Sequence, residues 1–301
     1  MVTQTPQRPV TGIFWMLVTG LCFIAVTALV KYIGPRLPPV EMAFLRYLLG
    51  LVFLLPAIGA LRDARLSPRQ WRLFTLRGVM HGLGVMLWFY AMVRIPIADV
   101  TAMNYLAPVY VTIGAALFLG ERLAFRRIAA VAAALIGALI ILRPGFREVS
   151  TGHLAMLGAA LAFGGSYLSA KVMADEVKPS VVVAMLSIFV TIVLAPFALM
   201  EWVTPTFMDL VLLFAVACFA VGGHYTMTLA FAAAPLTVTQ PVTFTQLVWA
   251  VLLGALVFDE SVDVWVVTGG IVILASVVFI TWREAAVKRQ GTTPVVNATK
   301  V

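Results

Sequence analysis

Apolar residues form long uninterrupted runs along this chain, and short polar segments separate the runs. Each run has roughly 16 to 23 residues, and a helix of about 20 residues crosses the hydrocarbon core of a bilayer, which is about 30 Å thick. We therefore expect ten transmembrane helices, over residues 12–31, 40–60, 73–93, 99–119, 127–142, 152–172, 180–200, 208–230, 237–257 and 264–282.

The sequence pattern repeats after 139 residues. Residues 96–143 align without a gap with residues 235–282, so that Glu121 falls on Glu260. Closer to the N-terminus the offset is 140, and a one-residue slip in a polar loop explains the difference. A repeat of this length is half a protein, not the unit of a solenoid.

Five helices per half is an odd number, so we expect the second half to enter the membrane upside down relative to the first. Inverted repeats are typical of transporters, because two similar halves can open a central site to either side in turn. The predicted organisation is an N-terminal tail, two five-helix halves and a C-terminal tail, over residues 1–11, 12–143, 152–283 and 284–301.

The basic residues lie mainly on one predicted side of the membrane. If the N-terminus is cytoplasmic, that side carries 15 Lys and Arg residues and the opposite side 5. Cytoplasmic loops are enriched in these residues, so both termini are expected in the cytoplasm.

Composition agrees with a polytopic membrane protein. The chain is 62% hydrophobic and 11% charged, its mean hydropathy is +1.03, and helices that are apolar all round need lipid around them. The net charge of +8 is dispersed over short loops, so lipid and not nucleic acid is the expected partner. Cys22 and Cys218 lie inside apolar runs and predict neither a disulfide nor a metal site.

The hinges LGER at 119–122 and FDES at 258–261, the ten runs and the duplication give the chain a family resemblance. Over about residues 10–285 it resembles the EamA-type drug/metabolite transporter superfamily, and within it the YddG-type bacterial amino-acid exporters. The resemblance implies ten helices around a central cavity, in a bacterial inner membrane, and export of small metabolites, often amino acids.

The third run carries the first candidate site residues. Arg77, His81, Gly84 and Trp88 recur at helical spacing and form one stripe. An ionisable residue at mid-membrane is a functional candidate by default, so His81 and Trp88 are expected to line a substrate cavity. The alternatives are an imidazole bonded by a hydroxyl of a neighbouring helix, and an indole that anchors the membrane interface.

The fourth run and its repeat partner carry a second candidate cluster. Asn104 and Tyr105 precede Pro108, which frees a backbone carbonyl near mid-membrane, and polar backbone at that depth needs a cavity or a partner helix. The repeat register aligns Asn104 with Thr243, and Gln246 follows one turn later. These side chains are expected to bind substrate; the alternative is that they only bond helix to helix.

Three further residues complete the candidate site. Arg46 lies about two turns into the second run, where a guanidinium needs a partner, and we expect it near the outer rim of the cavity. The expected partner is a backbone carbonyl of the first run or a substrate carboxylate, and Arg46 and His224 are both assigned to gating or to binding of a substrate carboxylate. Tyr167 flanks a stripe of small residues in the sixth run and is expected to reach the cavity.

No catalytic residue, metal or cofactor is predicted. The sequence contains neither a phosphate-binding G-x-x-x-x-G-K-[ST] loop nor an H-E-x-x-H or G-x-S-x-G motif. Glu121 and Glu260 begin the fifth and tenth runs, where carboxylates are expected to cap helix N-termini. All 13 carboxylates fall at predicted helix ends, loops or tails, which favours downhill transport or weak coupling through His81.

The predicted function is export of amphipathic amino acids, including aromatic ones, by alternating access. The alternatives are export of nucleoside- or drug-like metabolites, and a membrane enzyme or sensor on the same scaffold. The sequence leaves the oligomeric state open, a monomer included.

Overall fold

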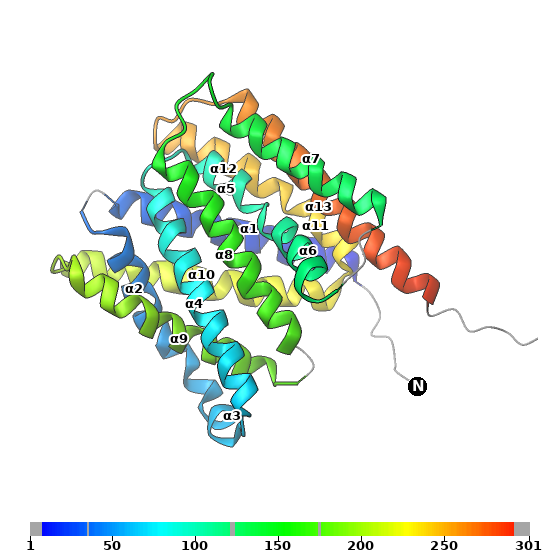
Figure 1. Cartoon of the computed structure of the whole chain (residues 1–301). Helices are drawn as coiled ribbons and strands as arrows, with labels where there is room; N and C mark the ends of the chain where they lie inside the picture. Colours follow the sequence, from blue (N-terminus) through cyan, green and yellow to red (C-terminus); the bar gives the residue numbers. More distant parts are fainter. Residues whose placement is uncertain (1–7, 35, 121–123, 174–175, 292–301) are drawn as a thin grey trace, which may run out of the picture.

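The computed structural model describes residues 8–34, 36–120, 124–173 and 176–291, and every regular element in them is a helix (Figure 1). The elements are α1 (Pro9–Ile33), α2 (Pro39–Gly50), the 3-10 helix η1 (Leu51–Ala57), α3 (Ile58–Asp63), α4 (Pro68–Met92), α5 (Ile97–Asn104), α6 (Ala107–Phe118), α7 (Phe125–Leu142), α8 (Thr151–Met173), α9 (Pro179–Met200), α10 (Phe207–Ala233), α11 (Leu236–Val242), α12 (Phe244–Val257) and α13 (Val264–Gly291).

Eight helical segments in the described residues are long and apolar enough to cross a membrane. Two of the ten predicted spans are missing from that set. The apolar part of α4 contains Arg77 and His81, which lower its hydropathy, and the span 237–257 is divided into α11 and α12. The number of ten therefore stays a prediction.

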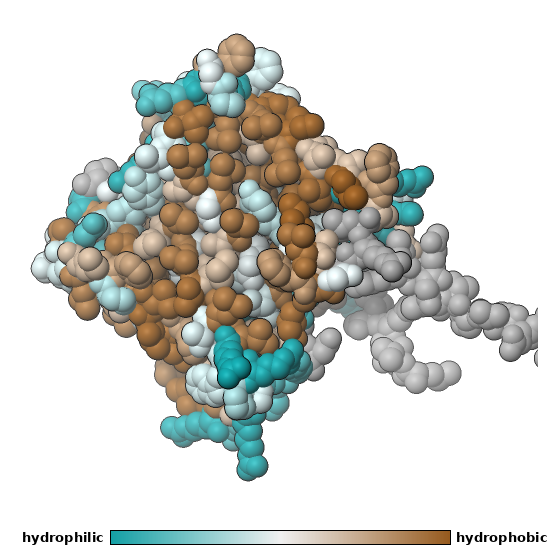
Figure 2. Space-filling view, in the orientation of Figure 1, coloured by the Kyte–Doolittle hydropathy of each residue, from teal (hydrophilic) through white to brown (hydrophobic). Residues whose placement is uncertain are grey.

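Large apolar side chains cover the outside of the bundle. Leu117, Leu199 and Leu256 are among the most exposed, and apolar surface occupies the middle of the molecule in Figure 2, with hydrophilic residues gathered at its extremities. Helices with apolar outer faces are stable in lipid and not in water. The chain is a membrane protein.

Local sequence signals begin the helices. Ser67 and Gln70 form a capping box before α4, and Thr206 and Asp209 form another before α10. Pro39 stands in the first turn of α2, where a missing backbone N–H costs nothing.

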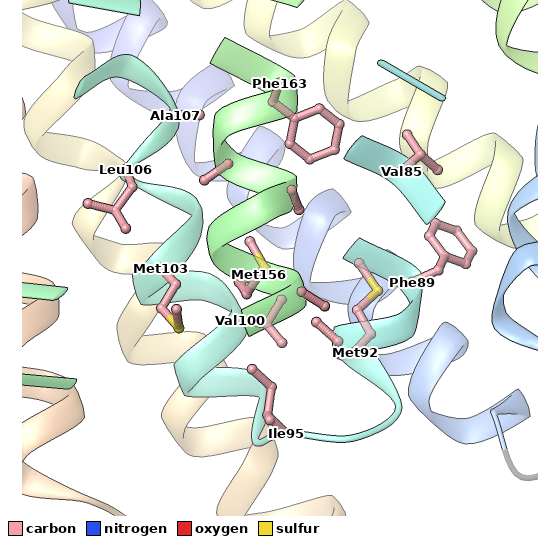
Figure 3. Packing of buried hydrophobic residues seen from close by; sticks show 14 of the residues in the cluster. Val85, Phe89, Met92, Ile95, Val100, Met103, Leu106, Ala107, Met156 and Phe163 are labelled. Carbon is pink, nitrogen blue, oxygen red and sulfur yellow. The ribbon is translucent and has the colours of Figure 1, made fainter. Parts of the chain in front are cut away.

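Figure 3 shows the part of the core that lies between α4, α5 and α8. Phe89, Met92, Met103 and Met156 interlock there and are fully buried. At the crossing of α7 and α13, a Cβ on Gly137 would lie 2.8 Å from the Gly269 carbonyl oxygen, so the close approach requires glycine.

The two predicted halves pack reciprocally. The most extensive helix contacts join α1 to α10 and α4 to α8, so the first helix of each predicted half lies against the third helix of the other. The fifth helices, α7 and α13, lie against each other (Figure 1).

The bundle has two ends that differ in charge. At the end that we call the ion-paired end, Lys31, Asp99, Arg147, Glu260 and Asp263 cluster where the loops before α8 and α13 meet (Figure 1). We call the opposite end, where α1 begins and α13 finishes, the tail end.

Candidate functional site

A central cavity of about 230 Å³ lies between helices of both predicted halves. The nine candidate residues from the sequence all line it: Arg46, His81, Trp88, Asn104, Tyr105, Tyr167, His224, Thr243 and Gln246. Their position on one cavity is a structural fact, and their part in binding stays a prediction.

Two helix interruptions meet at this cavity. α5 ends at Asn104 before α6 begins, and α11 ends directly before Thr243, the residue that the repeat register pairs with Asn104. The Tyr105 hydroxyl donates a hydrogen bond of 2.8 Å to the Thr243 carbonyl oxygen and links the two interruptions. Transporters build midplane binding sites from interrupted helices of this kind, because the breaks free backbone groups for a ligand.

Aromatic rings form one wall of the cavity. The Phe163 ring centroid lies 5.1 Å from that of His81, 6.1 Å from Trp88 and 6.3 Å from Tyr167, on which it stacks. His81 Nδ1 also lies 3.1 Å from the Ser166 hydroxyl. His81 therefore has both the cavity position and the hydroxyl partner that the sequence offered as alternatives.

Two polar groups that line the cavity have no hydrogen-bond or ion-pair partner among the described residues. Arg46 is 8% exposed, and its guanidinium carbon lies 4.2 Å from the centroid of the Tyr47 ring; no described carboxylate forms an ion pair with it. The Trp88 indole N–H is buried and has no hydrogen-bond acceptor within the described residues. Unpaired buried donors are costly, so they favour a ligand that accepts hydrogen bonds.

Sequence reasoning missed several lining residues. Tyr47, Phe23 and Phe163 contribute rings, and the Phe23 ring lies edge-on to His224 at 5.2 Å. The Thr19 hydroxyl lies 2.9 Å from that of Thr226 and joins α1 to α10. No local motif marks these residues, although Tyr47 directly follows Arg46.

The ion-paired end contains a second cavity of about 260 Å³ with a different character. Asp99 pairs with Arg147 and, at 2.9 Å, with His153, while Asp263 pairs with Arg143. Its lining shares no described residue with that of the central cavity. Because its charges already neutralise one another, this cavity offers little to a ligand.

Glu260 also belongs to the ion-paired end. It forms an ion pair of 2.5 Å with Lys31, and its other carboxylate oxygen accepts a 2.9 Å hydrogen bond from the Ile97 backbone N–H. The carboxylate thus caps α5, which belongs to the other half. We had expected it to cap the helix that follows it in the sequence, and that expectation was wrong. The matching expectation for Glu121 lies outside the described residues.

A third cavity, of about 280 Å³, adjoins the central one on the side of the tail end. The two share Pro108, Tyr167 and Val277. The central cavity is therefore contiguous with space toward the tail end.

The described residues contain no group of three His, Cys, Asp or Glu side chains that could hold a metal ion. The cavity walls instead combine aromatic rings with hydrogen-bond donors, which is the composition of a site for a small organic molecule.

Comparison with known proteins identifies the family. The model of the EamA-like transporter family matches residues 10–143 and 150–282. A riboflavin transporter of Rhizobium johnstonii is 30% identical to this chain, and the alignment covers 95% of each protein.

Two further relatives carry other substrates. An S-adenosylmethionine uptake transporter of Rickettsia prowazekii is 26% identical, over 91% of this chain and 93% of that protein. A pseudopaline exporter of Pseudomonas aeruginosa is 28% identical, over 88% and 94%.

A solved structure, titled only as the crystal structure of a protein, shares the fold. Its TM-score is 0.57 at 17% identity, over 93% of this chain and 97% of that one. Because the family model matches both halves and the relatives align over nearly their whole length, the chain belongs to the EamA-like transporter family.

Proposed function

We propose that this protein is a secondary transporter that carries small amphipathic metabolites with a planar ring through the central cavity by alternating access. The observation that carries the proposal is the cavity itself, in which interrupted helices of both predicted halves meet beside an aromatic wall and unpaired donors. The proposed setting is a bacterial inner membrane, with ten spans in two inverted halves and both termini in the cytoplasm.

The substrate class differs from the amino acids that the sequence favoured. The relatives are named for riboflavin, S-adenosylmethionine and pseudopaline, and none of these names supports export of free amino acids. Riboflavin and S-adenosylmethionine both contain planar heteroaromatic rings, which suit the stacked rings of Phe163 and Tyr167. The nucleoside- or drug-like alternative is therefore our preferred class.

The two ends of the bundle support an alternating mechanism. Ion pairs between the predicted halves, such as Lys31 with Glu260, close the ion-paired end, while the central cavity adjoins space toward the tail end. Breaking the first set of contacts and forming others at the tail end would expose the same cavity to the opposite side. By the charge count, the tail end is the cytoplasmic end.

We further propose that transport is downhill. No carboxylate is among the described residues that line the central cavity, so a carboxylate shared by substrate and proton is missing there. In a downhill carrier the direction follows the gradient of the metabolite, and the relatives include one that is named for uptake and one that is named for export.

Counterflow in proteoliposomes tests the function. Vesicles are loaded in turn with riboflavin, S-adenosylmethionine or phenylalanine, and uptake of the same labelled compound is followed at equal pH on both sides. We expect counterflow of at least one ring-containing metabolite above the rate in protein-free vesicles. Counterflow of phenylalanine alone, or of none across a panel extended to nucleosides, would contradict the proposal.

A further inference from the structure

The central cavity contains a buried cation, Arg46, whose charge no described carboxylate neutralises. Arg46 lies in the C-terminal half of α2, lines the cavity and is more than nine-tenths buried. In the described part of the chain its charged group has only the face of the Tyr47 ring as partner. A cation–π contact is weaker than the cost of withdrawing a guanidinium from water, so the site is electrostatically incomplete.

The rest of the wall adds donors and no negative charge. Trp88 contributes a buried N–H without an acceptor, and Asn104 and Gln246 contribute amides. The imidazoles of His81 and His224 are neutral or cationic in any protonation state. No carboxylate belongs to the lining that the structure describes.

The internal repeat gives no structural reason for a cation at this position. The repeat register pairs it with Leu186 in the other half, so the fold does not require a cation at this position. The second helix of the other predicted half, α9, forms with an apolar residue at the equivalent point.

We propose that the transported metabolite carries an acidic group and that Arg46 binds this group while the ring lies against Phe163 and Tyr167. The proposal rests on the proposed transport function and narrows its substrate class to ring-containing metabolites that carry a carboxylate or a phosphate. A guanidinium presents two parallel N–H donors, which match the two oxygens of a carboxylate or a phosphate. Binding of the anion completes the site, and Trp88 is left to donate to a polar atom of the ring system.

Matched ligand pairs test the proposal in the full-length protein in lipid nanodiscs. Indole-3-acetate and indole-3-acetamide have the same ring and almost the same size and differ in charge. Riboflavin 5′-phosphate and riboflavin form a second pair, in which the acidic group is a phosphate. Isothermal titration calorimetry gives the affinity for each compound.

We expect the acidic member of at least one pair to bind about 10- to 100-fold more tightly than the neutral member, as for other hydrogen bonds between charged groups. Arg46→Gln should bring the ratio of the two affinities close to one, and Arg46→Lys should keep part of the preference. Arg94→Gln is the matched control, because Arg94 is an exposed cation outside the cavity. It should leave the preference unchanged.

Three outcomes would overturn the inference: equal or tighter binding of the neutral members, an acid preference that survives in Arg46→Gln, and no binding of any acidic probe. Counterflow separates this failure from that of the transport function. If acidic ring-containing metabolites exchange in wild-type vesicles and Arg46→Gln leaves their rates unchanged, only the inference fails. If nothing exchanges, the transport function fails.

Discussion

The ion-paired end and the central cavity both bury charged side chains, but they treat the charge differently. At the ion-paired end, Asp99, Glu260 and Asp263 each face a cation within the protein. In the cavity, Arg46 faces an aromatic ring and open space. Burial of charge is costly in both places, and among the described residues those at the ion-paired end supply the opposite charge while those around Arg46 do not.

This difference separates a structural role from a binding role. Ion pairs that join the predicted halves stabilise one end of the bundle, and removal of either partner leaves the other charge unpaired. A cation that lacks a protein partner makes the empty protein less stable, and such a residue is retained where a ligand supplies the missing charge. The predictions below change one charge at a time at each place.

The largest effect is expected from Asp99→Ala. Asp99 is almost fully buried, and its removal leaves the Arg147 guanidinium and His153 without their shared carboxylate. Loss of one partner of a buried pair costs roughly 3 kcal/mol of unfolding free energy. Denaturant unfolding in detergent micelles measures it. The double variant Asp99→Leu, Arg147→Met should recover much of the loss, and a double variant as unstable as the single one would refute the pairing.

The opposite sign is expected from Arg46→Leu, which installs the residue found at the equivalent position of the other half. Because the cation has no carboxylate partner in the described residues, its removal should raise the unfolding free energy of the empty protein by about 1 kcal/mol. Transport of the acidic substrate should be lost in the same variant. A destabilised Arg46→Leu protein would mean that the cation has a structural partner after all.

An effect of similar size is expected from Glu260→Gln. The neutral side chain can still accept from the Ile97 N–H but loses its ion pair with Lys31, so the ion-paired end should open more often. The measurement is maleimide labelling of Met227→Cys in the cavity, with Cys22 and Cys218 changed to serine. We expect labelling from the ion-paired side to rise roughly fivefold, which corresponds to about 1 kcal/mol. An unchanged rate would show that this pair does not hold the end closed.

The sequence predicted the membrane class, the helical fold and the transporter family because long apolar runs and a repeat register are properties of the whole chain. The predicted effect of Pro108, a freed backbone carbonyl, depends on local geometry alone. Proline clashes with the carbonyl group four residues earlier, and α5 accordingly ends at Asn104, at the edge of the cavity.

The contacts of individual charges could not be read from local patterns. Glu260 precedes a helix and fits the rule for a cap, but its partners Lys31 and Ile97 come from the other half of the chain, and only tertiary packing brings them together. Tyr47 was overlooked because consecutive residues of a helix point in different directions, so a neighbour of Arg46 is not expected on the same cavity. In the structure both side chains are buried and both line the cavity.

The smallest effect is expected at the tail end, where Arg69 and Glu176 form an ion pair in water. Arg69 Nη1 donates to both carboxylate oxygens, at 2.7 and 2.9 Å, and these hydrogen bonds hold the pKa of Glu176 below its ordinary value of 4.5. A depressed pKa in the folded state means that the pair stabilises the protein at neutral pH. That contribution disappears as the pH falls through the lowered pKa.

Glu176→Gln should therefore be slightly less stable than the wild type at pH 7 and equal to it once the carboxylate of the wild type is protonated in acid. Both partners are exposed, so 1 M salt, which shortens the screening length to about 3 Å, should remove the difference at pH 7 as well. Asp99→Ala should keep most of its deficit in the same salt, because its partners are enclosed by protein. If salt abolished both deficits equally, the ion-paired end would be as accessible to water as the tail end, and the contrast between a closed end and an open cavity would fail.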